Sequence, residues 1–233
     1  MFMDNYINNL LFTYLPHIAM TLFWFGVITR IVKTSKSLQA ESSQFLSKKG
    51  QRWGGNLFHY GIILVFIGHF MGLFTPEHFY HLFMTTATKK ILAVIMGSVF
   101  GTAAVVGITI LLVRRLKDQR IRINSSIADI LLIALLLFEM GLGLISVAIS
   151  AGSSVENYAA LGEWAQKVIT FQPDAGVVIA GHSLIYKLHI VTGLFIFMIF
   201  PYTKLMHMFV MPLAYFFRSG YQLVRRGFTK RPA

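Results

Sequence analysis

Four of the eight histidines lie in apolar stretches of the sequence, where their type and spacing suit metal ligation. His59 and His69 share one stretch, and His189 and His207 share another. Ionisable residues in such stretches are uncommon, usually face the interior of a helix bundle and are candidates for function. Two neutral imidazoles above and below an iron porphyrin supply both axial ligands, and such a site suits electron transfer. The four histidines therefore predict two haems, each held by one pair.

Membrane-spanning helices must position these histidines. Hydrophobic residues make up 55% of the 233 residues and charged residues 13%, and the mean hydropathy is +0.64, too apolar for a soluble domain of this length. A bilayer core about 30 Å thick needs roughly 20 apolar helical residues. We predict an all-α integral membrane bundle, a single domain over residues 1–233, whose first apolar segment is retained because it lacks the features of a cleaved signal. The five predicted spans are residues 10–32, 53–74, 90–113, 127–150 and 182–209.

The positions of the basic residues predict the orientation of these spans. Six Lys and Arg residues lie around the first connection, five in the third, and six from the end of the last span onward, against two in the second and one in the fourth. Because cytoplasmic loops are rich in Lys and Arg, we expect the N-terminus outside and the C-terminus inside, with residues 210–233 as a cytoplasmic tail. This topology also accounts for the net charge of +12, so no nucleic-acid partner is expected.

The fourth connection is long enough to hold a short surface helix. It contains Glu156, Trp164, Phe171 and Pro173, so we weigh a segment lying along the membrane interface against an ordinary loop.

The second and fifth spans run in opposite directions, which brings His59 toward His207 and His69 toward His189. At the rise of an α-helix, His59 and His69 are about 15 Å apart along their axis, whereas His189 and His207 are about 27 Å apart. The two spacings do not match. A kink at Pro201 can absorb the difference, because proline removes a helical hydrogen bond and bends the helix.

Small residues flank the histidines and leave room for a flat macrocycle. They are Gly55, Gly68, Gly72 and Gly193. The alternative is close packing between helices, which Gly97 and Gly101 also illustrate.

Other metal chemistry fits the sequence less well. The absence of Cys excludes iron–sulfur clusters and Cys-ligated zinc within this chain. A metal other than haem iron stays open, but no carboxylate lies close in sequence to complete such a site. We expect structural or interfacial roles for His17, His78, His81 and His182.

The sequence resembles the gamma subunit of membrane-bound respiratory nitrate reductase, a dihaem cytochrome b. The segments that carry the resemblance are SSQFLSKKG (42–50), NLFHYGIILVFIGHFMGLFTP (56–76), ADILLIALLLFEMGLGL (128–144), IYKLHIVTGLFIFMIFPYTKLMH (185–207) and YQLVRR (221–226). The N-terminus and the fourth connection match less well.

The resemblance implies two b haems in a bacterial cytoplasmic (inner) membrane. It assigns His59 and His207 to the inner haem, and His69 and His189 to the outer one. It places the oxidation of menaquinol or ubiquinol beside the outer haem and assigns a quinone-binding lysine to Lys89, with Lys90 as the fallback. A cation there stabilises charge on a quinone oxygen, although a lysine snorkelling at a helix end is the alternative.

Glu139 departs from the family, for which we expect an uncharged residue such as Gln in the middle of the fourth span. Packing by hydrogen bonds to another helix or a haem edge is the first interpretation, and proton transfer is the second.

The resemblance implies that electrons leave quinol, cross two haems and reach an iron–sulfur subunit and then a molybdenum catalytic subunit that reduces nitrate. It places the protein in anaerobic respiration and nitrate assimilation. The alternatives are a cytochrome b subunit of a related sulfite- or disulfide-linked complex, or a proton-coupled transporter that uses intramembrane His and Glu.

Overall fold

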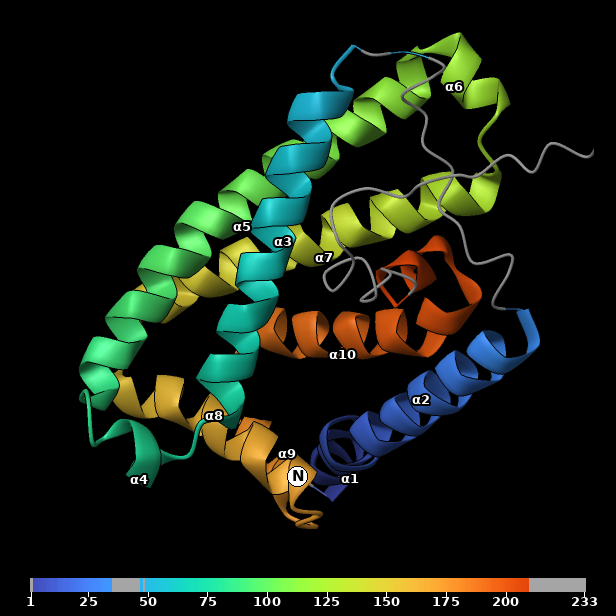
Figure 1. Cartoon of the computed structure of the whole chain (residues 1–233). Helices are drawn as coiled ribbons and strands as arrows, with labels where there is room; N and C mark the ends of the chain where they lie inside the picture. Colours follow the sequence, from blue (N-terminus) through green and yellow to red (C-terminus); the bar gives the residue numbers. More distant parts are fainter. Residues whose placement is uncertain (1, 35–46, 48, 210–233) are drawn as a thin grey trace, which may run out of the picture.

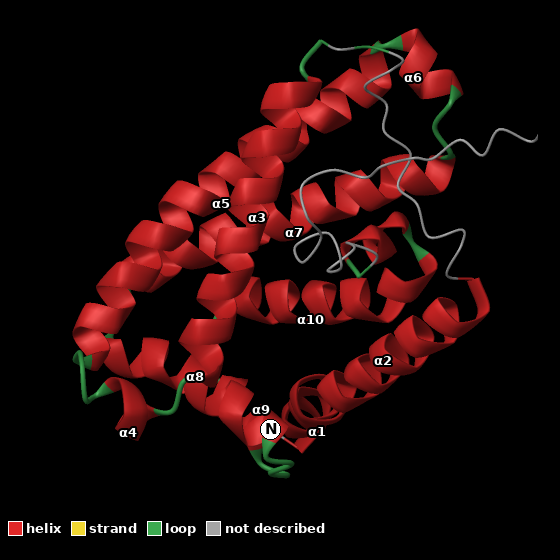
Figure 2. Cartoon of the chain, viewed as in Figure 1, coloured by secondary structure: helices red, strands yellow, loops and turns green. Residues whose placement is uncertain are grey.

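The computed structural model describes residues 2–34, 47 and 49–209, and these form helices and connecting loops without a strand (Figure 2). Five helical runs are long and apolar enough to cross a membrane, which confirms the predicted number. They are Tyr6–Lys33, Gln51–Phe74, Thr86–Lys117, Ile127–Gly152 and Leu184–Tyr202. The first run contains the end of α1 (Phe2–Asn9), a π-helical turn η1 (Leu10–Tyr14) and α2 (Leu15–Thr34).

Helix α3 (Gln51–Phe74) packs closely along α5 (Thr86–Lys117), as Figure 1 shows. Glycines permit this approach. A Cβ atom placed on Gly107 would lie 2.3 Å from the backbone nitrogen of Phe58, and one on Gly61 would lie 2.6 Å from the backbone nitrogen of Ala104. The two backbones therefore touch, and α3 is held in place by α5.

Helix α7 (Ile127–Gly152) packs on the next face of α5. A Cβ atom on Gly97 would lie 3.0 Å from Val147, and one on Gly101 would lie 2.8 Å from Leu144. At these two glycines the helix-packing interpretation is correct.

Helix α10 (Leu184–Ile199) packs against both α7 and α2. The ring of Phe23 on α2 contacts the rings of Phe197 and Phe200, with centroids 5.3 Å apart in both cases. Helix α10 is thus fixed from two sides, while α3 is positioned through α5.

The fifth run breaks at Pro201. Helix α10 ends at Ile199, and the chain continues as the 3₁₀ turns η4 (Phe200–Tyr202) and η5 (Lys204–Met208), separated by the extended residue Thr203. A Cβ atom on Gly26 of α2 would lie 2.6 Å from Pro201 Cγ, so a glycine accommodates the proline ring. The predicted span 182–209 was therefore too long, because proline cannot continue the hydrogen-bond ladder of the helix.

The fourth connection, for which an interfacial segment and an ordinary loop were both weighed, contains the helix α8 (Val155–Ile169), followed by the short α9 (Ala175–Ile179). Trp164 of α8 is buried and donates its indole N–H to the carbonyl of Phe12 at 2.8 Å. The backbone N–H of Gly176 donates to Thr13 Oγ1 at 2.8 Å. Trp164 therefore anchors α8 to the first span, whereas Phe171 is 77% exposed.

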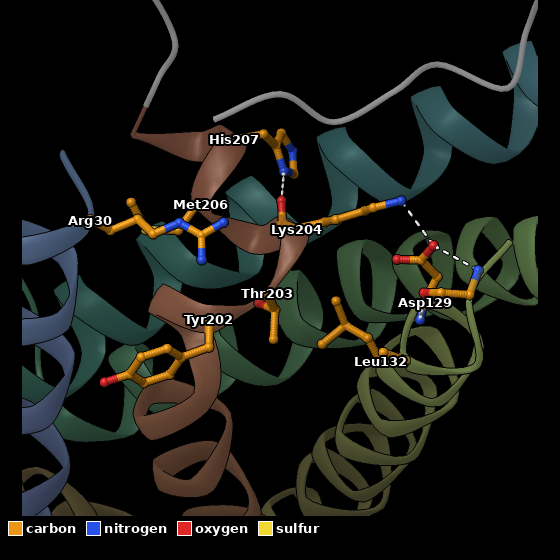
Figure 3. A pocket seen from close by; sticks show the side chains of 10 residues that line it. Arg30, Asp129, Leu132, Tyr202, Thr203, Lys204, Met206 and His207 are labelled. Atoms are coloured by element: carbon orange, nitrogen blue, oxygen red, sulfur yellow. Dashed lines mark hydrogen bonds and ion pairs between the residues drawn. The ribbon is translucent and has the colours of Figure 1, made fainter. Parts of the chain in front are cut away.

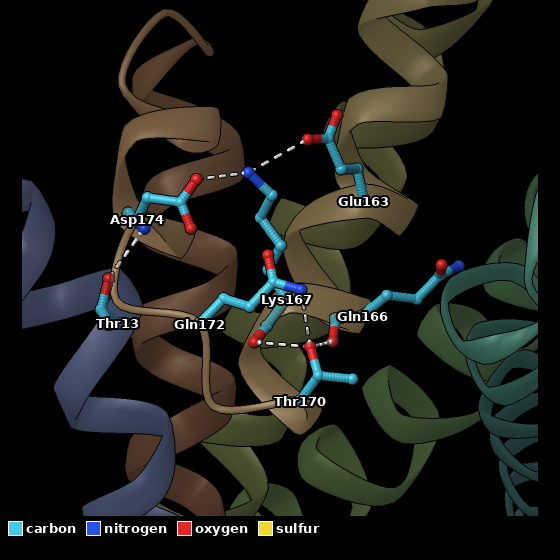
Figure 4. A network of polar contacts seen from close by, with 8 residues as sticks. Thr13, Glu163, Gln166, Lys167, Thr170, Gln172 and Asp174 are labelled. Atoms are coloured by element: carbon cyan, nitrogen blue, oxygen red, sulfur yellow. Dashed lines mark hydrogen bonds and ion pairs between the residues drawn. The ribbon is translucent and has the colours of Figure 1, made fainter.

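A polar network closes the turn between α8 and α9 (Figure 4). Lys167 Nζ lies 2.5 Å from Asp174 Oδ2 and 3.4 Å from Glu163 Oε1. The hydrogen bond between Lys167 and Asp174 lowers the pKa of Asp174 and raises the pKa of Lys167. The Asp174 carboxylate is 55% exposed, so the contribution of this pair to stability is screened by water and salt.

Candidate functional site

The structure brings the four histidines together in two pairs. The rings of His59 on α3 and His207 on η5 have centroids 6.2 Å apart, and those of His69 on α3 and His189 on α10 have centroids 5.9 Å apart. This is the pairing expected from antiparallel spans. Because the fifth run turns at Pro201, the unequal spacing of the histidines along the two spans no longer matters.

Three of these histidines have the same hydrogen bond at Nδ1. His59 Nδ1 lies 2.8 Å from the Gly55 carbonyl oxygen, and His69 Nδ1 lies 2.9 Å from that of Val65. His207 Nδ1 lies 2.6 Å from the carbonyl oxygen of Lys204. A neutral imidazole that donates from Nδ1 carries its free lone pair on Nε2, the nitrogen then available to a metal.

The separations within the pairs fit one metal ion between two imidazoles. Metal–imidazole bonds of roughly 2 Å hold the two ring centres about 6 Å apart. Among the described residues, no three His, Cys, Asp or Glu side chains converge as a metal site. A metal held by two histidines would need its other ligands from elsewhere, and a porphyrin supplies four nitrogens. The donor set therefore fits haem.

The glycines near the histidines have different surroundings. Cβ atoms on Gly68 and Gly72 would meet nothing within 4 Å, and one on Gly55 would meet only Gln51 Nε2, at 3.9 Å. These three leave space beside the histidines, as expected. Gly193 does not, because a Cβ atom there would lie 3.0 Å from Glu139 Oε1.

Glu139 is the polar neighbour of the fourth histidine. Its Oε1 atom lies 2.9 Å from His189 Nδ1, and the two side chains are only 16% and 21% exposed. The contact is close, but the ring nitrogen and the carboxyl oxygen are not aligned as a regular hydrogen bond, and neither His189 Nδ1 nor Glu139 Oε2 has another partner in the described part of the chain.

A pocket of about 380 Å³ opens beside His207 (Figure 3). Its lining includes Arg30 and Tyr202. Lys204 Nζ lies 2.8 Å from Asp129 Oδ2, and Asp129 also begins α7 through a reciprocal capping box with Ser126. The pocket thus places cationic side chains next to a histidine, an arrangement that suits carboxylate groups.

Lys89 and Lys90 lie at the start of α5. Lys89 Nζ is 3.9 Å from the centre of the Tyr80 ring, and Lys90 Nζ donates to the carbonyl oxygen of Ser153. The hydroxyl of Tyr80 hydrogen bonds with Thr86 Oγ1 at 3.0 Å. Lys90 is therefore bound to the end of α7, whereas Lys89 lies over the Tyr80 ring and within electrostatic reach of Glu77, and its quinone-binding role stays a prediction.

Of the remaining described histidines, His78 is exposed and the other three make local contacts. His17 stacks on Phe171 with ring centres 4.8 Å apart, and His182 Nε2 lies 3.1 Å from the carbonyl oxygen of Asn157. His81 Nε2 is 2.9 Å from Thr86 Oγ1. These contacts suit the structural roles expected for them.

Two parts of the site escaped sequence analysis. One is the ion pair between Asp129 and Lys204, which joins α7 to η5. The sequence does indicate the position of Asp129, because it lies three residues after Ser126, the spacing of a capping box at the start of a helix. The neighbour of Glu139 was not identified because His189 lies on another helix, 50 residues away.

Five helical runs that are long and apolar enough to cross a membrane, together with the paired histidines on α3, α10 and η5, define a multi-pass helical membrane protein. The profile of the nitrate reductase gamma subunit family matches residues 8–227, so the chain belongs to that family.

Its relatives include two gamma chains of respiratory nitrate reductases from Escherichia coli K12. The chain is 36% identical to the gamma chain of respiratory nitrate reductase 2, over 96% of this chain and 99% of the relative. It is 36% identical to that of respiratory nitrate reductase 1, over 94% of this chain and 98% of the relative. It is 37% identical to the nitrate reductase gamma chain of Bacillus subtilis, over 91% of this chain and 96% of the relative. The predicted family is confirmed, while the expected role in nitrate assimilation disagrees with relatives that are named as respiratory.

Proposed function

We propose that this chain is the dihaem cytochrome b subunit of a respiratory nitrate reductase and that it oxidises menaquinol or ubiquinol. The observation that carries the proposal is the pair of histidine contacts, 6.2 Å and 5.9 Å between ring centres, which α3 makes with η5 and α10. Family membership favours this function over a proton-coupled transporter or a sulfite- or disulfide-linked complex.

In this proposal His59 and His207 hold the inner haem, and His69 and His189 hold the outer one. Arg30 and Lys204, which line the pocket beside His207, would bind the carboxylates of the inner haem, with Lys204 also paired to Asp129. When bound, the haems supply one-electron transfer from quinol to the iron–sulfur subunit, which feeds the molybdenum subunit that reduces nitrate.

The distribution of basic residues supports the proposed direction. The ends of the spans that lie near η5 are rich in Lys and Arg, so we assign them to the cytoplasmic side of a bacterial inner membrane, where the partner subunits bind. Each electron moved inward across the bilayer corresponds to about 2.3 kcal/mol per 100 mV. Quinol oxidation at the opposite end, near α8, therefore conserves redox energy.

Lys89 is proposed to bind the quinol. Its ammonium group lies over the Tyr80 ring and can hydrogen bond a quinol oxygen as charge develops there. Replacing a charged hydrogen-bond donor by alanine costs about 1.5–3 kcal/mol, so Lys89→Ala should lower kcat/KM for quinol about 10- to 100-fold. Lys90→Ala is the matched control. Equal effects of the two variants would contradict the assignment.

Haem quantitation on the purified complex tests the ligands. Alanine at His59 or His207 should remove one haem, and alanine at His69 or His189 should remove the other. His78→Ala, an exposed histidine outside the pairs, should retain both. A colourless wild-type complex, or variants that do not separate into these two classes, would overturn the proposal.

A further inference from the structure

The seam between α7 and α10 is built from two polar side chains that each face a glycine of the other helix. A Cβ atom on Gly143 of α7 would lie 3.2 Å from His189 Cε1, and one on Gly193 of α10 would lie 3.0 Å from Glu139 Oε1. Because Glu139 and Gly143 are four residues apart, as are His189 and Gly193, each pair occupies one face of its helix. The seam thus fixes the carboxyl group against the imidazole.

The next turn of the seam sets the same register. The hydroxyl of Tyr186 hydrogen bonds with Ser150 Oγ at 2.7 Å and donates to the Ser146 carbonyl oxygen at 3.1 Å. Tyr186 lies one turn before His189 on α10, and Ser146 lies close to Gly143 on α7. These bonds hold the two helices so that Glu139 and His189 stay side by side.

His189 differs from the other three paired histidines at Nδ1. Those three direct Nδ1 to a carbonyl oxygen of their own helical segment. His189 Nδ1 instead lies 2.9 Å from Glu139 Oε1. Within the described part of the chain, no backbone carbonyl oxygen accepts a hydrogen bond from it. One histidine of one pair therefore has a carboxyl partner, and the other pair has none.

We infer that Glu139 is a positioning residue for His189 that lowers the reduction potential of the outer haem relative to the inner one. The inference rests on the proposed function. A carboxyl oxygen 2.9 Å from Nδ1 favours the tautomer that is protonated on that nitrogen, which leaves the Nε2 lone pair for a metal and would make the imidazole a stronger donor to it. Stronger donation would favour the oxidised iron, so a haem held by His189 would have a lower reduction potential than one held without such a carboxyl neighbour.

Redox titration of the purified complex tests this role. Glu139→Leu should raise the reduction potential of the outer haem by about 59 mV, which is about a tenfold change in the equilibrium constant of a one-electron reduction. The potential of the inner haem should stay unchanged. Glu139→Gln should raise the potential of the outer haem less, because an amide oxygen of the same reach remains beside Nδ1. The outer component is identified as the one that His69→Ala removes.

Phe138→Leu is the matched control, because Phe138 is the neighbour of Glu139 on α7 and its side chain is 54% exposed. An outer potential that stays unchanged in Glu139→Leu, or that shifts equally in Phe138→Leu, overturns the inference. Loss of only the outer haem in Glu139→Leu, with recovery in Glu139→Gln, supports it. A wild-type complex without haem refutes the proposed function instead, so the two failures are distinct.

Discussion

Helices α3 and α5 approach each other most closely at Gly107, where there is no room for a methyl group. In Gly107→Ala, the new methyl group would lie 2.3 Å from the backbone nitrogen of Phe58 and 2.8 Å from the carbonyl oxygen of Gly54. Both atoms belong to the backbone of α3, so no side-chain rotation relieves the overlap. To reach a normal contact near 3.5 Å, α3 must move away from α5 by about 1 Å.

The cost follows from two opposing effects. Overpacking that displaces backbone costs typically about 1–3 kcal/mol, and a clash with two backbone atoms belongs at the upper end. Alanine offsets about 1 kcal/mol of this through its higher helix propensity. The variant should therefore lose about 2 kcal/mol of stability. Because Phe58 precedes His59, the displacement should lower the occupancy of the inner haem more than that of the outer haem.

Thermal unfolding in detergent, followed by circular dichroism, and reduced-minus-oxidised spectra measure both effects. Gly152→Ala is the control, since a Cβ atom on Gly152 meets nothing within 4 Å, and it should be neutral or slightly stabilising. If Gly107→Ala unfolds at the same temperature as Gly152→Ala and keeps both haems in equal amounts, the argument from close helix approach is refuted.

Three further predictions concern polar contacts. Asp129→Asn weakens the ion pair to Lys204 that holds η5, so stability should fall by about 1–3 kcal/mol and the inner haem should be lost first; haem content after mild heating measures this. The pKa of Asp174 is lowered by Lys167, so this pair stabilises the turn above the usual carboxyl pKa and loses that effect as pH falls through the lowered value. Hydrogen exchange of residues 170–175 should therefore accelerate in acid, and Asp174→Asn should remove this dependence. Trp164→Phe removes the indole donor to the first span, and an unfolding free energy lower by about 1–3 kcal/mol is expected; an unchanged value would show that water replaces the donor.

The sequence was sufficient for the number of apolar helices and for the pairing of the histidines. Both depend on strong signals: runs of apolar residues about as long as a bilayer is thick, and the two spans that lie between the second and the fifth, which make those two antiparallel. The end of the fifth run was wrong by several residues. The apolar composition continues past Pro201, but the backbone hydrogen bonds do not.

Contacts between distant side chains could not be predicted. Glu139 was recognised as unusual, yet its position beside His189 depends on the register of α7 against α10, which two glycines decide. Trp164 was weighed as an interfacial residue, but a π-helical turn in the first run presents the Phe12 carbonyl to it. Such a turn depends on local packing rather than on hydrophobic periodicity.

The break at Pro201 also divides the protein mechanically. His69 and His189 are both carried by continuous α-helices, whereas His207 is carried by a short turn beyond the break. A displacement of that turn, for example by a protein that binds against it, is not transmitted along α10, because η5 and α10 do not form one continuous helix. We expect it to tilt the His207 imidazole and leave the pair of His69 and His189 undisturbed, so the two proposed haem sites would respond separately to a partner.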